Sequence, residues 1–240
     1  MLVAAAVCPC PPILVPEVAS GAASELDELR AACDTALRAV LAAGPELIVV
    51  VGPGDGHQWY ERGGTGSFLP YGVDLRVRLG REPADARDAA GPSVEELPPA
   101  LAVGAWLLER AGWLGEVRGL SVPDYLDPAL CRENGLQLAE SAERVGLLVL
   151  GEGSARRSLK APGYLDDRAE AFDRGVALAL GSADAKGGLA SLDDDLAFEL
   201  MASGRAPWQV LAAAAGTGRG AELLYHGAPY GVGYFVAAWT

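Results

Sequence analysis

Four segments of this 240-residue chain have residues that could take part in chemistry, and the first two contain a thiol and an imidazole, respectively. Residues 8–12 read Cys-Pro-Cys-Pro-Pro, and Cys10 could act there as a nucleophile or a soft-metal ligand, because prolines fix the direction of neighbouring side chains. His57, one of only two histidines, ends the glycine-rich stretch 52–57. The alternatives are that Cys8 and Cys10 are small buried hydrophobic residues and that His57 is an ordinary surface residue.

A third segment, residues 151–158, contains Ser154 and the pair Arg156-Arg157. Two arginines can grip a carboxylate or a phosphate through paired hydrogen bonds. We therefore expect Arg156 to hold an acidic substrate and Ser154 to contact the same ligand. The alternative is a solvated pair that forms salt bridges on an acidic surface.

The fourth segment, residues 222–235, contains Tyr225 and His226 among several aromatic residues. These side chains could surround a planar ligand, whereas Tyr234 and Phe235 are expected to belong to the core.

Several familiar catalytic patterns are absent from the sequence. No Cys-x-x-Cys or His-Glu-x-x-His pattern occurs, and two histidines cannot supply a three-histidine metal site. Residues 52–57 lack the Gly-Lys-Ser/Thr ending of a phosphate-binding loop.

The apolar runs 2–7, 47–51 and 146–150 predict buried strands, and amphipathic helices are expected between them. This alternation predicts one α/β domain over residues 1–240, a three-layer αβα arrangement with a mostly parallel or mixed sheet. Ligands bind such sheets beyond the carboxyl ends of the strands, and four loops are expected there: residues 8–16, 52–66 and 151–163 and the turn near His226. Ser24, Ser93 and Asp127 are expected to cap helices.

The composition limits the partners and the location of the protein. A formal charge of −13 opposes binding to nucleic acid or to anionic membranes. No apolar run approaches the ~20 residues that span a bilayer, and no basic segment precedes the first one, so a cytoplasmic protein with free thiols is expected.

Taken in order, the four segments resemble the class III extradiol ring-cleavage dioxygenase superfamily, which includes the Memo-like proteins. The resemblance covers nearly the whole chain and is closest to a divergent actinobacterial branch. Its most specific parts are Ala-Pro-Gly-Tyr-Leu at 161–165 and Tyr-Gly-Val-Gly-Tyr at 230–234. It implies the same α/β fold, Fe(II)-dependent cleavage of aromatic compounds, and in many relatives a homo-oligomer.

The resemblance also implies which positions bind iron. Cys10 stands where active members have one histidine ligand, and Gly54 stands where they have the other, with His57 three residues further on. Ala155 replaces the acid-base histidine, and Glu222 is only a loose match for the metal-binding glutamate. Fe(II) needs two histidines and one carboxylate, so ordinary ring cleavage is not expected.

Three hypotheses remain, and the third is family-typical iron dioxygenase activity with unusual ligands. In the first, a rebuilt site uses Cys10, His57 and Arg156 in catalysis, with Cys10, His57 and Glu222 as ligands for another metal such as Zn. Either Glu152 or Glu222, together with His226, would complete that site. In the second, the chain is a non-catalytic, Memo-like protein that binds an acidic or aromatic small molecule or a partner, and Cys10 lies apart from His57.

Overall fold

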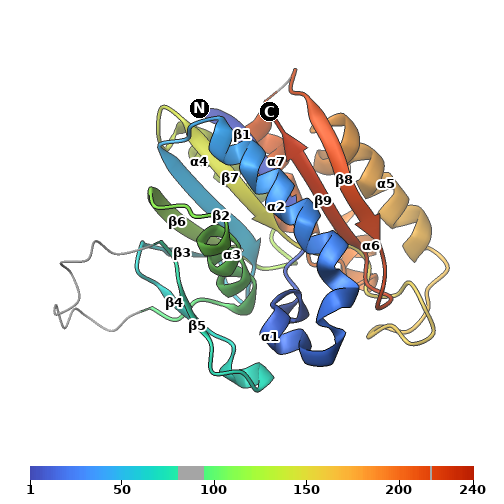
Figure 1. Ribbon diagram of the computed structural model, residues 1–240. Helices are drawn as coiled ribbons and strands as arrows, with labels where there is room; N and C mark the ends of the chain where they lie inside the picture. The colour runs from blue at the N-terminus through green and yellow to red at the C-terminus, as the bar shows by residue number, and fades with distance from the viewer. Residues whose placement is uncertain (81–94, 217) are drawn as a thin grey trace.

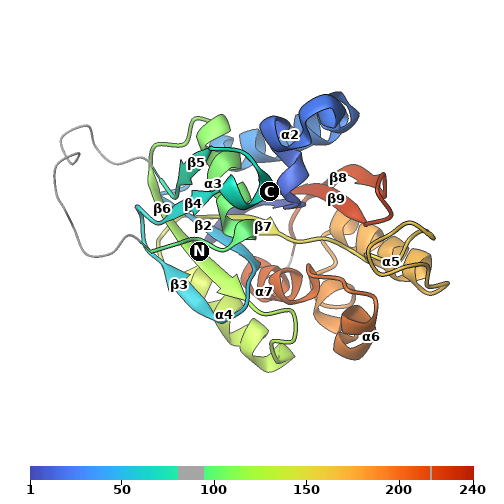
Figure 2. The same cartoon turned by 90° about the horizontal axis from the view of Figure 1, so that it is seen from below.

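The computed structural model describes residues 1–80, 95–216 and 218–240 of the chain. A seven-stranded mixed sheet forms its centre, with helices on both faces (Figures 1 and 2). The strand order is β3-β6-β2-β7-β1-β9-β8. The predicted three-layer αβα fold with a mixed sheet is therefore confirmed.

Four parallel strands make up the middle of the sheet: β1 (Leu2–Cys8), β7 (Val145–Leu150), β2 (Leu47–Pro53) and β6 (Glu116–Val122). The short β3 (Gln58–Tyr60) runs antiparallel to β6 at one edge. At the other edge, β9 (Tyr234–Trp239) runs antiparallel to both β1 and β8 (Ala221–Gly227). A separate small sheet pairs β4 (Thr65–Ser67) with β5 (Arg76–Arg78).

Each face of the large sheet has its own hydrophobic core. The face that carries Val50 packs against α2 (Asp27–Ala42) and α3 (Pro99–Arg110). The face that carries Val49 and Val51 packs against α4 (Pro128–Glu140), α5 (Ala169–Ser182) and α7 (Arg205–Ala215). The remaining short elements are α1 (Pro16–Ala19), α6 (Asp194–Glu199) and the 3-10 turns Pro12–Leu14, Ser20–Leu26, Leu69–Tyr71 and Leu189–Ser191.

The helix starts agree only in part with the sequence. Asp127 caps α4 as predicted, since its Oδ1 accepts a hydrogen bond from the Ala129 N–H at 2.7 Å. The prediction for Ser24 is wrong, because this residue lies in a 3-10 turn and α2 begins at Asp27. Ser93 lies outside the described residues. Among those residues, no helix is long and apolar enough to cross a membrane.

Candidate functional site

Cys10 and Glu152 meet at the carboxyl end of the sheet, two residues beyond β1 and β7 respectively. The Cys10 backbone N–H donates to Glu152 Oε1 at 2.9 Å. Ser203, which the sequence analysis did not single out, donates its hydroxyl to Glu152 Oε2 at 2.7 Å. Both carboxylate oxygens therefore already hold a protein donor, and Glu152 ties together the two loops and the segment before α7.

The Cys10 thiol lies in an environment that favours its protonated form. Its side chain is buried, and burial together with the nearby Glu152 carboxylate raises the pKa of the thiol well above its usual range. Burial likewise raises the pKa of the Tyr234 hydroxyl, with smaller contributions from Glu152 and Cys10. A nucleophilic cysteine needs a lowered pKa, so this environment opposes the role predicted for Cys10.

His57 lies far from Cys10. Its Nε2 is 2.9 Å from the Asn134 Oδ1 of α4, and the preceding Gly56 carbonyl accepts the Ser121 hydroxyl at the end of β6. Because β2 and β7 lie between β6 and β1, these two strands are three strand spacings apart, which is about 14 Å. His57 lies near β6, and Cys10 follows β1. Moreover, α4 covers one face of the sheet, whereas Cys10 belongs to the core of the other. The predicted pairing of Cys10 with His57 is wrong.

Glu222 is equally remote from Cys10. It pairs with Ala238 on β9, which in turn pairs with Ala6 on β1, so Glu222 is level with the middle of the sheet and on its outermost strand. The metal site predicted from Cys10, His57 and Glu222 is therefore wrong. No group of three or more His, Cys, Asp or Glu side chains that could hold a metal ion occurs within residues 1–80, 95–216 and 218–240. These residues do not fit the ligand set that iron requires.

Asp173, which the sequence analysis missed, anchors the 151–158 loop. Its Oδ1 accepts the Ser154 backbone N–H at 2.8 Å, and its Oδ2 accepts from Arg157 at 2.8 Å. Burial raises the pKa of the Asp173 carboxyl, and the Ser154 N–H and the Arg157 guanidinium oppose that rise. A Cβ at Gly153 or Gly233 would lie within 2.4 Å of an Asp173 oxygen, so a side chain at either position would displace this carboxylate. The sequence contained one signal for this role: Asp173 lies on the apolar face of an amphipathic helix, where an acidic residue needs a partner.

Ser154 has a structural role. The residue is fully buried, its hydroxyl donates to the Leu200 carbonyl at 3.1 Å, and its Oγ accepts the Arg156 N–H at 3.1 Å. These hydrogen bonds hold the 151–158 loop in its shape, and contact between Ser154 and a ligand stays a prediction.

Arg156 remains available, in contrast to its neighbour Arg157. Its Nε is buried without a hydrogen-bond partner, and the guanidinium forms no ion pair with any described residue. The side chain lies beside Gly163 and Met201, since a Cβ at Gly163 would be 2.7 Å from both Arg156 Cγ and Met201 Sδ. The nearby Asp166 pairs with Arg168 instead, which is the main reason that its pKa is lowered to about 2.

Tyr225 and His226 do not share a face of the sheet. The His226 ring stacks on Phe235, with centroids 5.1 Å apart, on the side covered by α5 and α7. Tyr225 packs against the core on the opposite side. Successive residues of a strand point to opposite faces, so the prediction that both surround one planar ligand is wrong.

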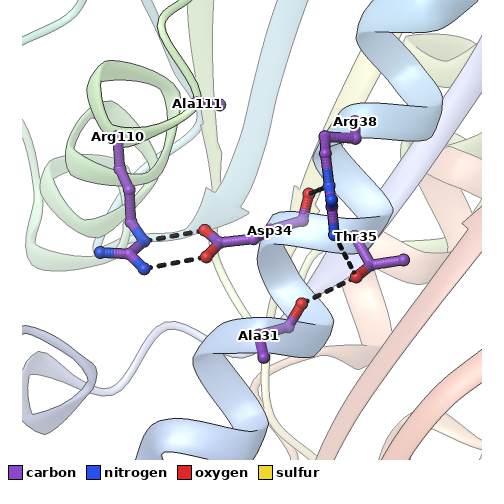
Figure 3. A pocket seen from close by; sticks show the side chains of 6 residues that line it. All are labelled: Ala31, Asp34, Thr35, Arg38, Arg110 and Ala111. Carbon is purple, nitrogen blue, oxygen red and sulfur yellow. Dashed lines mark hydrogen bonds and ion pairs between the residues drawn. The ribbon is translucent and has the colours of Figure 1, made fainter.

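A cavity of about 600 Å³ lies between α2 and α3 (Figure 3). Arg110 donates to both Asp34 oxygens at 2.8 Å, and Arg38 donates to the Thr35 hydroxyl at 2.8 Å. Both Arg110 and Arg38 are therefore already hydrogen-bonded to side chains of the protein. None of the residues predicted to form the site lines this cavity.

The comparisons with known proteins define a class by fold alone. The chain is similar over 99% of its length, and 99% of the other chain, to the crystal structure of the uncharacterized protein JW3007 from Escherichia coli K12, with a TM-score of 0.57 and 17% identity. At this identity the likeness shows a shared fold. No protein-family model matches the chain, and no curated protein matches it.

Proposed function

We propose that the chain is a non-catalytic, Memo-like relative of the extradiol dioxygenases that binds a small acidic ligand beside Arg156. The observation that carries this proposal is the buried, unpartnered Nε of Arg156 in a strand-end loop. A buried donor without a partner is costly, and an anionic ligand would satisfy it.

The same loop supports a ligand with an apolar or aromatic body. Met201 lies beside Gly163 and Arg156, Tyr164 follows Gly163 in the chain, and the two side chains are 63% (Tyr164) and 47% (Met201) exposed. Tyr164 also has a backbone φ of 61°, a left-handed conformation that is strained for an aromatic residue and tends to persist where the surroundings fix it. An arginine beside exposed apolar side chains suits an aromatic carboxylate.

Ring cleavage is not supported by the residues at the sheet edge. Cys10 and His57 lie on opposite faces, Ala155 stands where the resemblance implies an acid-base histidine, and both Glu152 oxygens are engaged. The reaction would lack its iron ligands and its base.

The test is a calorimetric titration of benzoate into the wild-type protein and into Arg156→Gln. We expect saturable binding that weakens at least tenfold in the variant, because a charge-assisted hydrogen bond contributes about 1.5–3 kcal/mol. Arg174→Gln is the matched control: it removes the same charge from an exposed residue paired with Glu170, and it should leave binding unchanged.

Two results would overturn the proposal. One is benzoate affinity that is equal in the wild type and Arg156→Gln. The other is anaerobically Fe(II)-loaded wild-type protein that cleaves catechol on addition of oxygen and loses this activity in Cys10→Ala.

A further inference from the structure

A second cavity, of about 440 Å³, lies against α4 and α7 on the face of the sheet opposite α2 and α3. This volume falls within the range of about 300–1,000 Å³ that small-molecule sites occupy. Three segments border it: α4, α7, and the stretch from Ala185 to Ala190 that precedes and enters a 3-10 turn. It shares no residue with the Arg156 loop.

Most of the lining is aliphatic. Pro128 and Leu136 come from α4, and Ala212 comes from α7. The amide of Gln209 also borders the cavity, but its Nε2 donates to the Leu192 carbonyl at 3.1 Å and its Oε1 accepts from Arg205 at 3.0 Å. Because these partners occupy the amide, the lining presents mainly carbon to a ligand, and it contains no aromatic ring.

Close packing of α4 on α7 holds two of these walls in place. Gly135 allows this approach, since a Cβ there would lie 2.3 Å from the Val210 carbonyl oxygen and 2.6 Å from the Ala213 Cβ. A site formed between closely packed helices needs little rearrangement to accept a ligand.

Two cations line this otherwise aliphatic cavity: Arg132 on α4 and Lys186 in the 185–190 stretch. Neither forms a hydrogen bond or an ion pair through its side chain with any residue that the structure describes. Both side chains are exposed at the rim of the cavity, so an anionic ligand can reach them. The cavity between α2 and α3 shows the contrast, because Asp34 and Thr35 hold its arginines (Figure 3).

We propose that this cavity binds a small aliphatic carboxylate, with the hydrocarbon chain against the alanine and leucine surface and the carboxylate held by Arg132 and Lys186. Burial of the methylene groups favours binding of the hydrocarbon chain, and the two cations select for the anion. The inference is independent of the function proposed for Arg156.

The test uses octanoate as the probe and octan-1-ol as its neutral counterpart, both titrated into the full chain by calorimetry. We expect octanoate to bind at least tenfold more tightly than the alcohol. In the double variant Arg132→Gln with Lys186→Gln, octanoate affinity should fall at least tenfold and octanol affinity should stay the same. The double variant Arg76→Gln with Arg174→Gln removes two charges elsewhere and should bind octanoate as the wild type does.

Ala190→Trp provides a second variant, because an indole at this exposed lining position would fill the cavity without disturbing the core. It should abolish binding of both probes while the far-UV circular dichroism stays unchanged. The proposal is overturned if octanoate does not bind saturably, or if its affinity is unaffected by these variants. Loss of octanoate binding in Arg156→Gln would also overturn it, by placing the probe at the other site, and would leave the proposal for Arg156 intact.

Discussion

The thiols of Cys8, Cys10, Cys33 and Cys131 are all buried and free. Cys8 and Cys33 lie against each other, and their hydrogen bond is the largest cause of the raised pKa of Cys8. For Cys10 and Cys131, burial is the largest cause. The sequence shows that thiols are present, but their reactivity depends on burial, which only the packed fold determines.

Cys131 gives a pH dependence whose sign follows from its pKa, which burial raises from 9.0 to about 11. Below pH 9 the thiol is protonated in both the folded and the unfolded chain, so its full contribution to the free energy of unfolding is present. Between about pH 9 and 11 the unfolded chain releases the proton and the folded one retains it, which lowers the free energy of unfolding by on the order of 2 kcal/mol.

Urea denaturation of the wild type and of Cys131→Ser at a series of pH values measures this effect. The hydroxyl keeps a donor near the Leu126 carbonyl and does not ionise in this range. We expect the difference in stability between the two proteins to shift in favour of the variant as the pH rises from 9 to 11. A difference that is constant over this interval would contradict the argument.

At the scale of elements, local signals predicted what local interactions decide. The apolar runs form the predicted strands, and Asp127 caps α4 through its own side chain. The cap predicted at Ser24 is wrong because residues 20–26 form a 3-10 turn. The buried Arg30 guanidinium stabilises this turn: it donates to the Leu14 and Ala23 carbonyls and pairs with Asp27. No local pattern encodes such a contact.

Asp173 on α5 joins that helix to the 151–158 loop, so its loss should destabilise the fold. In Asp173→Asn the Arg157 guanidinium, only 19% exposed, loses its carboxylate partner. We expect the free energy of unfolding to fall by about 3 kcal/mol, as is usual when a buried pair is broken. Glu170→Gln, which breaks the exposed pair with Arg174 on the same helix, should change it by less than about 0.5 kcal/mol. Urea denaturation that gave equal effects would show that the buried pair is not an anchor.

The contact between α4 and α7 depends on Gly135. An alanine there would place its Cβ 2.3 Å from the Val210 carbonyl oxygen, so we expect a loss of about 1–3 kcal/mol from overpacking. Gly175 in α5 is the matched control, since a Cβ there meets nothing within 4 Å. Gly175→Ala should stabilise the protein by about 0.5–1 kcal/mol through helix propensity. Thermal unfolding of the two variants should therefore shift in opposite directions, and equal shifts would contradict this account.

At the scale of the whole molecule, the order of strands across the sheet explains why the site was predicted only in part. Cys10 and Glu152 were expected at strand ends and do meet, because β1 and β7 are neighbours. His57 also follows a strand end, but the chain there turns outward to β3, beyond β6. The lateral order of the strands depends on how the crossovers pack, and sequence distance does not reveal it.

This separation makes a prediction for the metal content of the whole protein. Because Cys10, His57 and Glu222 occupy different parts of the sheet, a metal ion could gain only one of these ligands at a time, and a single side chain binds a divalent ion weakly. We expect protein purified anaerobically without a His-tag to contain far less than one equivalent of Fe or Zn by elemental analysis, with the same content in Cys10→Ala. Near-stoichiometric metal that disappears in Cys10→Ala would contradict the prediction, since it would require the loops after β1 and β2 to rearrange until their donors meet.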